Sequence, residues 1–451
     1  MKFSLTTAEI TPQGPIFLAG FGDRTHKSEG VHEPLFAKAA LIQANTTLLI
    51  ITLDVVGSDR SFIVGIKNIL EEKFGLKHEE VLINFSHTHH SVALTGADER
   101  LRVGLFSIGK DFSEDVSFYG YIRDTLVSIV DECFSQLEEG TLLLGRGTSD
   151  FAISRRKLTA DGVKWAPYPE AEIDKDLIVL KLVDQENEVR GILYNYGCHP
   201  TSMSSDNYMI SNDFPGTTSR YLEETYPGVT ALFLQGCAGE LKPIKSADGD
   251  IFKSCSLTEM EEAGRDLAKD IISILEEQPF TPIRCSFRTI LVDPLLYMEQ
   301  TGIPFYENII NDSKVGDFRK RGAHRTIEQI QDGSVKDRTP IYLSIWHLDE
   351  ETRLIAMEGE ISTEYSLLLK SMFPGGKTIV LGYTNGVYYY VPTRKMIAEG
   401  GYEVDCNYCF GGFRGSFVPE IEDIIIGQIT KADLLLRTQS QPITHDEEWS
   451  K

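Results

Sequence analysis

Short apolar runs alternate with amphipathic segments along this chain. Residues 47–56 form an apolar run with the length of a buried strand, and residues 61–75 carry apolar side chains at helical spacing. Residues 81–85 form a second apolar run that contains β-branched side chains. The order strand, helix, strand is typical of an α/β protein, so we predict this fold class for the chain.

The alternation continues towards the C-terminus. We predict further strands at residues 177–183, 191–197, 230–236, 341–348, 352–358 and 378–383. We predict further helices at residues 114–139, 257–277, 361–373 and 420–437. Residues 294–340 show no clear periodicity, and we interpret them as either a substrate-side insertion or a mobile loop.

Composition and organisation indicate one large globular unit. Of the 451 residues, 41% are hydrophobic and 25% are charged, which is typical of a soluble globular protein. No linker rich in proline or serine divides the chain, and no internal repeat is visible. We therefore predict a single domain over residues 1–440, followed by a polar tail at residues 441–451.

The cysteines, the N-terminus and the net charge limit which cellular compartment and which binding partners we expect. The seven cysteines are scattered, apart from Cys406 and Cys409, which is typical of reduced thiols. The N-terminus does not read as a signal peptide and no run is long enough to span a membrane, so we predict a cytoplasmic protein. A net charge of −23 argues against nucleic acid and anionic membranes as partners. A small-molecule partner is expected, and the sequence is compatible with a homo-oligomer.

The strongest candidate for chemistry follows the strand predicted at residues 81–85. His87, His89 and His90 are three of the chain's ten histidines, and they lie within four positions. On an extended backbone alternate side chains face the same way, so His87 and His89 could point at one metal ion or substrate. A histidine-rich polar loop explains the stretch equally well, because a lone His-x-His recurs by chance.

Three distant groups follow other predicted strands. His199 comes after the apolar run 191–198, and Glu360 follows a strand and a glycine. A dense tyrosine cluster begins at Tyr383, and Tyr402 lies downstream of it. Loops at strand ends often carry functional groups. Turn capping, helix capping and packing are the structural alternatives for each group alone.

Taken in order, these segments resemble the neutral, non-lysosomal ceramidases and their bacterial relatives, which are zinc-dependent amidases. The resemblance rests on eight stretches: SHTHHS, ISRRKL, IDKDLIVLKL, GCHPTSM, ISNDFPG, GEIST, YYVPT and GGYE. It implies a large mixed sheet with flanking helices and a catalytic zinc ion (Zn2+).

The resemblance also assigns roles to individual residues. It implies four zinc ligands: His87, His199, Glu360 and Tyr390. It makes His89 and Tyr402 groups beside the metal, the first for proton transfer and the second for stabilising an oxyanion. It places Arg155 at the substrate. Mixed nitrogen and oxygen donors suit Zn2+, which lowers the pKa of bound water to about 7.

The chain departs from the family pattern where ceramidases carry a serine. Lys242 stands at that position, where it can bind an anionic group of a substrate or can be an ordinary surface lysine. The stretch after His90 also lacks the family's Gly-Pro-rich continuation, which changes the expected pocket rim. We also predict no immunoglobulin-like domain after the catalytic domain, in contrast to full-length ceramidases of the family.

We therefore predict a zinc-dependent hydrolase that cleaves an amide bond of a polar or anionic N-acyl substrate rather than long-chain ceramide. A zinc esterase or lactonase is the alternative enzyme, since the same chemistry attacks either carbonyl. A catalytically silent metal-binding relative is the alternative from another class. Cys406 and Cys409 are interpreted as structural.

Overall fold

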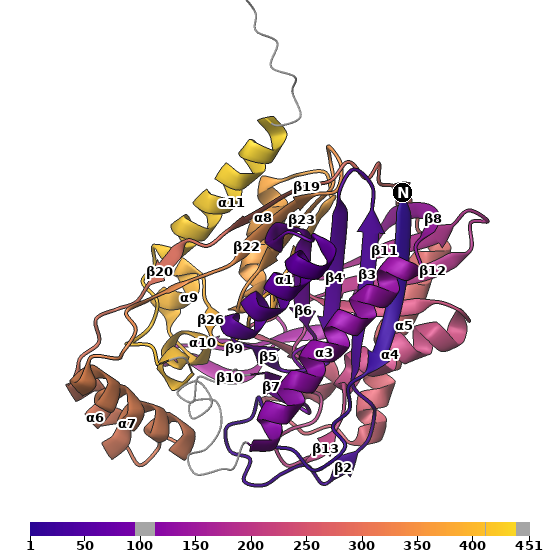
Figure 1. Ribbon diagram of the computed structural model, residues 1–451. Helices are drawn as coiled ribbons and strands as arrows, with labels where there is room; N and C mark the ends of the chain where they lie inside the picture. Colours follow the sequence, from indigo (N-terminus) through magenta and orange to yellow (C-terminus); the bar gives the residue numbers. More distant parts are fainter. Residues whose placement is uncertain (95–112, 411, 439–451) are drawn as a thin grey trace, which may run out of the picture.

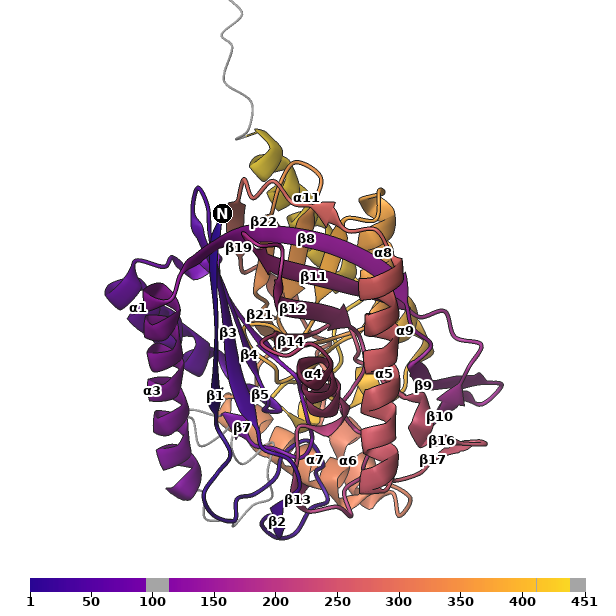
Figure 2. The same ribbon diagram turned by 90° about the vertical axis from the view of Figure 1, so that its right-hand side faces the viewer.

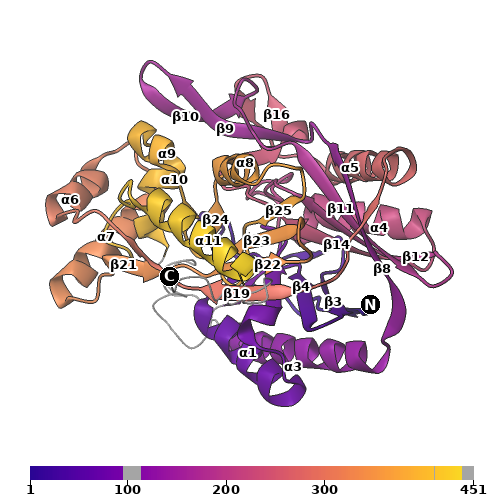
Figure 3. The ribbon, with the colours of Figure 1, turned by 90° about the horizontal axis from the view of Figure 1, so that it is seen from above.

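The computed structural model describes residues 1–94, 113–410 and 412–438, and the polar tail predicted at 441–451 lies outside them. Within these residues, two large β-sheets pack face to face, with helices on both outer faces (Figure 1). Figure 3 shows these layers from above. The predicted α/β fold with a large mixed sheet and flanking helices is confirmed.

The larger sheet has the strand order β14-β12-β11-β8-β1-β3-β4-β6, with β18 beside β8. Its strands are β1 (Lys2–Glu9), β3 (Phe36–Gln43), β4 (Thr47–Leu53), β6 (Val81–Phe85), β8 (Glu138–Thr148), β11 (Asp176–Asp184), β12 (Val189–Tyr196), β14 (Thr230–Gln235) and β18 (Thr281–Pro282). The pairs β4–β6 and β12–β14 are parallel and the other pairs are antiparallel.

The larger sheet bends into two halves (Figure 2). Strands β1 and β8 are paired only through Lys2 with Glu139 and Phe3 with Glu138. The two outer strands approach each other, because the amide of Gln235 on β14 donates to Oδ1 of Asn84 on β6 at 2.8 Å. The ends of β6, β12 and β14 therefore lie in one region of the molecule.

The second sheet has the order β19-β22-β23-β25. Its strands are β19 (Arg288–Val292), β22 (Leu343–His347), β23 (Arg353–Met357) and β25 (Thr378–Leu381). Strand β4 shows why the sheets stack. Leu48 and Ile50 pack in one cluster with Trp346 of the second sheet, whereas Leu49 and Ile51 face the helices on the opposite side. A strand buried on both faces needs the continuous apolar run seen in the sequence.

Helices cover both outer faces. The larger sheet is covered by α1 (Arg60–Phe74), α3 (Ser113–Ser135), α4 (Asp213–Thr225) and α5 (Leu257–Glu277). The second sheet is covered by α8 (Thr363–Met372) and α11 (Ile421–Thr438). Helix α5 has the predicted bounds, since Ser256 and Glu259 form a capping box at its start. The prediction of a helix at 114–139 was too long. Helix α3 ends at Ser135, and Glu138 already belongs to β8.

Residues 294–340 are more regular than the sequence indicated. They form β20 (Leu295–Tyr297), the helix pair α6 (Ile303–Asn311) and α7 (Asp317–Asp332), and β21 (Arg338–Pro340). The periodicity of α7 is weak because its buried residues are Gly322, Ala323 and Thr326 rather than large apolar side chains. Gly333 ends α7 in the left-handed conformation at φ 76°. The reading of this segment as a loop was wrong.

Short elements complete the fold around the site. The strands are β2 (Gly30–Val31), β5 (Gly57–Ser58), β7 (Ala93–Leu94), β9 (Ala152–Thr159), β10 (Gly162–Tyr168), β13 (Met209–Ile210), β15 (Leu241–Pro243), β16 (Ala247–Asp248), β17 (Ile251–Phe252), β24 (Glu360–Ile361) and β26 (Tyr390–Val391). The helical turns are η1 (His78–Glu80), η2 (Ile244–Ser246), α9 (Arg394–Glu399), α10 (Tyr402–Asp405) and η3 (Asn407–Cys409). Among the helices described, none has the length and apolar character needed to cross a membrane.

Candidate metal centre

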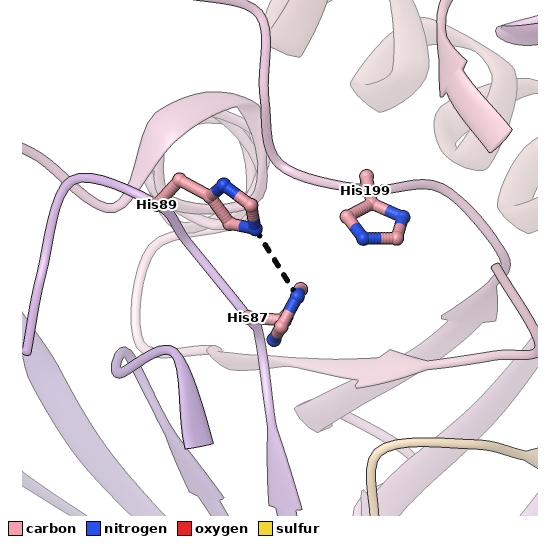
Figure 4. A group of neighbouring side chains, drawn as sticks. All are labelled: His87, His89 and His199. Carbon is pink, nitrogen blue, oxygen red and sulfur yellow. Dashed lines mark hydrogen bonds between the residues drawn. The ribbon is translucent and has the colours of Figure 1, made fainter. Parts of the chain in front are cut away.

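His87 and His89 meet, although not through strand alternation (Figure 4). Strand β6 ends at Phe85, and His87 lies in the left-handed region at φ 67°. This conformation is uncommon for a residue other than glycine. Both imidazoles are buried, and their Nε2 atoms are 3.2 Å apart. The expected convergence is present, but the extended backbone expected beyond Phe85 was wrong.

Backbone carbonyls fix the orientation of two imidazoles. His87 Nδ1 donates to the carbonyl of Val56 at 2.5 Å, and His199 Nδ1 donates to the carbonyl of Ala238 at 2.7 Å. A carbonyl only accepts, so both Nδ1 atoms carry the proton and both Nε2 atoms keep a lone pair in the neutral rings. Metal-binding histidines commonly have this arrangement.

The Glu360 carboxylate faces both of these lone pairs. Its Oε2 atom lies 3.0 Å from His199 Nε2 and 3.5 Å from His87 Nε2. Burial raises the pKa of Glu360, and His87 and His199 lower it below its ordinary value only in their charged forms, which carry a proton on Nε2 as well. Ligands about 2.0–2.1 Å from a tetrahedral Zn2+ lie about 3.3 Å from one another. The three groups therefore fit a zinc ion.

Tyr390 is placed beside Glu360 by the backbone. Strands β24 and β26 pair in parallel with Glu360 opposite Tyr390. The Tyr390 hydroxyl accepts a hydrogen bond from Arg155 Nη2 at 3.2 Å. Burial and then the Glu360 charge raise the pKa of Tyr390 well above its ordinary value, and the Arg155 charge opposes them.

Arg155 is held by several groups at once. Its Nε atom donates to Glu403 at 2.8 Å, and its Nη2 atom donates to the carbonyl of Gly239 at 2.7 Å. Its guanidinium lies 4.1 Å from the centre of the Trp165 ring. Arg155 therefore orients Tyr390 within a fixed network.

His89 differs from the other two imidazoles. Its Nδ1 atom is buried, and no group in the described parts of the chain bonds to it. Burial lowers the pKa of His89 well below its ordinary value, and the charges of His87, His199 and Arg24 lower it further. The ring lies against Gly20, where a Cβ would be 2.3 Å from it. Gly20 also has a φ of +91°. A side chain at this position is therefore excluded both by the contact with His89 and by the backbone conformation.

Lys242 is buried rather than on the surface. It lies in β15, which pairs with β9, and only 8% of it is exposed. Its Nζ atom donates to the Thr201 carbonyl at 3.0 Å and to the Thr201 hydroxyl at 2.9 Å. Glu240, a carboxylate near it in sequence, instead accepts from Ser362 at 2.7 Å. Burial lowers the pKa of Lys242 to about 8, and the nearby Arg155 charge adds to the shift.

A cavity of about 590 Å³ joins these groups. The site residues on its wall are His87, His89, Arg155, Lys242, Glu360, Tyr390 and Tyr402. His199 is fully buried behind this wall but reaches Glu360. The four proposed ligands and the four residues expected at the substrate thus lie in or beside one cavity, which is large enough for a small organic molecule.

Sequence reasoning missed several supporting residues. The Tyr383 hydroxyl lies 3.4 Å from His199 Nδ1, and its ring centre is 4.7 Å from that of His87. Glu403 binds Arg155 and Arg156 together. The dense tyrosine cluster was a signal for Tyr383, and the stretch GGYE contains Glu403, although no local pattern indicated that Glu403 pairs with two arginines.

The cysteine pair lies outside the metal-binding cluster. Cys406 and Cys409 are buried below helix α7, where a Cβ on Gly322 would be 2.9 Å from the Cys409 sulfur. This tight packing is compatible with the structural role expected for them.

The fold and the site define an α/β protein with a cluster of side chains that could hold a metal ion at the ends of its strands. The chain belongs to the family described as neutral/alkaline non-lysosomal ceramidase, N-terminal, whose model matches residues 5–251. The resemblance seen in the sequence motifs is therefore confirmed.

Individual relatives agree with the family. The neutral ceramidase of Pseudomonas aeruginosa is 26% identical over 256 residues, which cover 54% of this chain and 37% of that protein. The neutral ceramidase of Drosophila melanogaster is 25% identical over 242 residues, which cover 50% of this chain and 32% of that protein. The match thus spans roughly a third of the length of these relatives.

A solved structure shares the fold. The crystal structure of neutral ceramidase from Pseudomonas aeruginosa matches this chain with a TM-score of 0.74 at 18% sequence identity. The match covers 97% of this chain and 74% of that chain.

Proposed function

We propose that the protein is a zinc-dependent hydrolase that cleaves the amide bond of an N-acyl compound with water. One observation carries the proposal. The Nδ1 atoms of His87 and His199 donate to backbone carbonyls, so both Nε2 lone pairs are directed at the Glu360 carboxylate. A histidine pair that only stabilised the fold would not need both rings locked in the ligand tautomer.

Four side chains would hold the ion: His87, His199, Glu360 and Tyr390. The Tyr390 phenol is the weakest of them, because burial and Glu360 both favour its protonated form. The hydrogen bond from Arg155 favours the ionised form and so supports ligation. When bound, zinc supplies a Lewis acid for the carbonyl and lowers the pKa of a water molecule.

His89 and Tyr402 would act on the substrate directly. The His89 ring lies beside the proposed ligand His87, with their Nε2 atoms 3.2 Å apart, and its low pKa makes the neutral base the resting form. It would take a proton from water and deliver it to the leaving nitrogen. The Tyr402 hydroxyl would donate to the carbonyl oxygen as negative charge develops there. Both residues line the cavity.

The substrate would be polar or anionic. Relatives named neutral ceramidase support an amide as the scissile bond. Lys242 argues against long-chain ceramide, because a buried ammonium group facing a lipid chain loses its hydration without gaining a partner. The alternatives are a zinc esterase or lactonase and a catalytically silent metal-binding relative.

Metal analysis and a substrate panel test the proposal together. We expect about one zinc per chain, as catalytic sites of this ligand type contain. The zinc-loaded protein should hydrolyse N-acyl amides faster than the matched esters relative to their uncatalysed rates. Bound zinc with ester turnover alone would favour the esterase or lactonase, and bound zinc without any turnover would favour the silent relative.

The proposal also covers the domain boundaries, the cellular compartment and the oligomeric state. Residues 1–440 would form one hydrolase domain acting on a small molecule in the cytoplasm. Homo-oligomerisation is compatible with this function. Fluorescence localisation of the tagged protein and light scattering test these two points.

A further inference from the structure

One side of the cavity is a continuous run of aromatic rings. We call it the aromatic wall, and its members are Phe318, Phe410, Tyr390, Tyr402 and Trp165. Successive ring centres in this order are 5.8, 5.9, 5.7 and 5.0 Å apart. All five residues line the cavity. Phe318 comes from α7 and Trp165 from β10, so segments far apart in the sequence build one apolar surface.

The cavity also carries the cation Lys242, which makes no ion pair within 4.0 Å with a carboxylate of the described residues. Its Nζ atom donates to Thr201, and the carboxylate whose charge acts on it is Asp213, which itself accepts from Ser202. Arg155 differs, because Glu403 neutralises it. An anion entering this cavity would therefore find its charge complement at Lys242.

The cation lies on the side of His89. The His89 amide donates to the Pro200 carbonyl at 3.4 Å, and the next residue, Thr201, binds Lys242. Tyr402 belongs to the opposite side, because its ring contacts Tyr390 and Trp165 of the aromatic wall. The proton carrier of the proposed reaction is thus a neighbour of Lys242, whereas the oxyanion donor lies among the rings of the aromatic wall.

We propose that the substrate is an N-acyl amino acid with an apolar acyl chain. This inference rests on the proposed function. The leaving nitrogen faces His89, so the carboxylate attached next to that nitrogen reaches Lys242. The carbonyl oxygen faces Tyr402, so the acyl chain continues along the aromatic wall. A neutral amine part leaves the buried ammonium group without a partner, which weakens binding.

The reaction balances without a further reagent. Water adds its hydroxyl group to the acyl carbon, and the carbon–nitrogen bond breaks. His89 passes the remaining proton of that water to the leaving nitrogen. The products are a carboxylic acid and a free amino acid.

Three matched compounds test the assignment on the zinc-loaded protein. They are N-decanoylglycine, its neutral analogue N-decanoylglycinamide, and N-acetylglycine. We expect kcat/KM for N-decanoylglycine to exceed that for N-decanoylglycinamide by about 10- to 100-fold, as a charged hydrogen bond contributes. It should also exceed that for N-acetylglycine, since acetyl has no chain to lie on the aromatic wall.

Two variants test the contributions of Lys242 and of the aromatic wall separately. Lys242→Met should bring the ratio between the glycine and glycinamide compounds close to one. Phe318→Ala should reduce turnover of N-decanoylglycine more than that of N-acetylglycine. Lys245→Met is the matched control, because Lys245 is exposed and pairs with Glu262. It should leave both ratios unchanged. A folding defect would lower all rates together and would not change a ratio.

Several results would overturn the inference. Equal turnover of N-decanoylglycine and N-decanoylglycinamide would overturn it while leaving amide hydrolysis intact, as would an unchanged ratio in Lys242→Met. Preference for N-decylsuccinamic acid, which carries the carboxylate on its acyl part, would reverse the orientation and reject it. Zinc-loaded protein that hydrolyses none of these compounds would overturn both the inference and the proposed amidase.

Discussion

The floor of the cavity and its aromatic wall are built in different ways. We use the term histidine floor for His87, His199 and Glu360. These side chains follow strands of the two sheets, and backbone carbonyls or strand pairing fix each of them. The rings of the aromatic wall contact mainly one another, from elements as separate as α7 and β10. We expect the floor to hold the metal, whereas the wall contributes Tyr390 and Tyr402 to the reaction and, together with Lys242, sets the choice of substrate.

Removing a floor residue should have the largest effect. We expect His199→Ala to lose zinc and to reduce activity by about 1,000-fold or more, because metal and activated water are lost together. Elemental analysis and kcat/KM on the same samples test this. His324→Ala is the control, since His324 is exposed on α7. Full zinc content in His199→Ala would place the metal elsewhere.

A change in the wall should leave the metal in place. We expect Tyr402→Phe to keep its zinc and to lose about 100-fold in kcat with little change in KM, as a lost oxyanion donor does. The exposed Tyr297 provides the control variant Tyr297→Phe. A fully active Tyr402→Phe enzyme would remove the oxyanion role.

The sequence predicted the histidine floor better than the aromatic wall, because the floor depends more on local sequence patterns. Strands buried on both faces need continuous apolar runs, so β4 and β6 and the histidines after β6 were visible in the pattern. The left-handed turn at His87 was not visible, because side chains and strands elsewhere impose it. Contacts such as Phe85 N to the Tyr383 carbonyl join residues that are distant in the sequence.

The wall depends on such distant contacts almost entirely. Helix α7 was read as irregular because its buried face consists of small residues, yet it supplies Phe318. Glu240, two residues before Lys242, does not pair with it, because Ser362 donates to the Glu240 carboxylate whereas Lys242 donates to Thr201. Family motifs selected residues that the structure brings to one cavity, whereas local pattern alone did not reveal what each one contacts.

A smaller effect should follow from disturbing one ring of the histidine cluster. Gly20→Ala would place a Cβ 2.3 Å from the His89 ring and strain the backbone at φ +91°. We expect retained zinc and about 10-fold lower kcat, from a misplaced His89 and roughly 1–3 kcal/mol of strain. Gly14→Ala is the matched control, because its Cβ would have no neighbour within 4 Å. Wild-type kinetics for Gly20→Ala would show that the position of His89 is not critical.

The smallest effect concerns the cost of burying Lys242. In the folded protein, burial and then the Arg155 charge lower the pKa of Lys242 to about 8. In the unfolded chain the pKa of a lysine is about 10.4. Between these values the unfolded chain binds more protons, so the free energy of unfolding should rise with pH. The slope from this group is at most about 1.4 kcal/mol per pH unit.

The difference between the protein and Lys242→Met isolates that slope, because the other groups facing Lys242 are present in both. These groups are Arg155, Asp213, Cys198 and Cys255. Urea unfolding at intervals between pH 7.5 and pH 9.5 should show the protein gaining stability relative to Lys242→Met. The protein should gain none relative to Lys245→Met, whose lysine is exposed. A difference that stays constant over this range would mean that Lys242 remains charged in the folded state. Its ammonium group would then already be stabilised as an ion inside the protein, with Asp213 as the opposite charge, and would have less need of an anionic substrate.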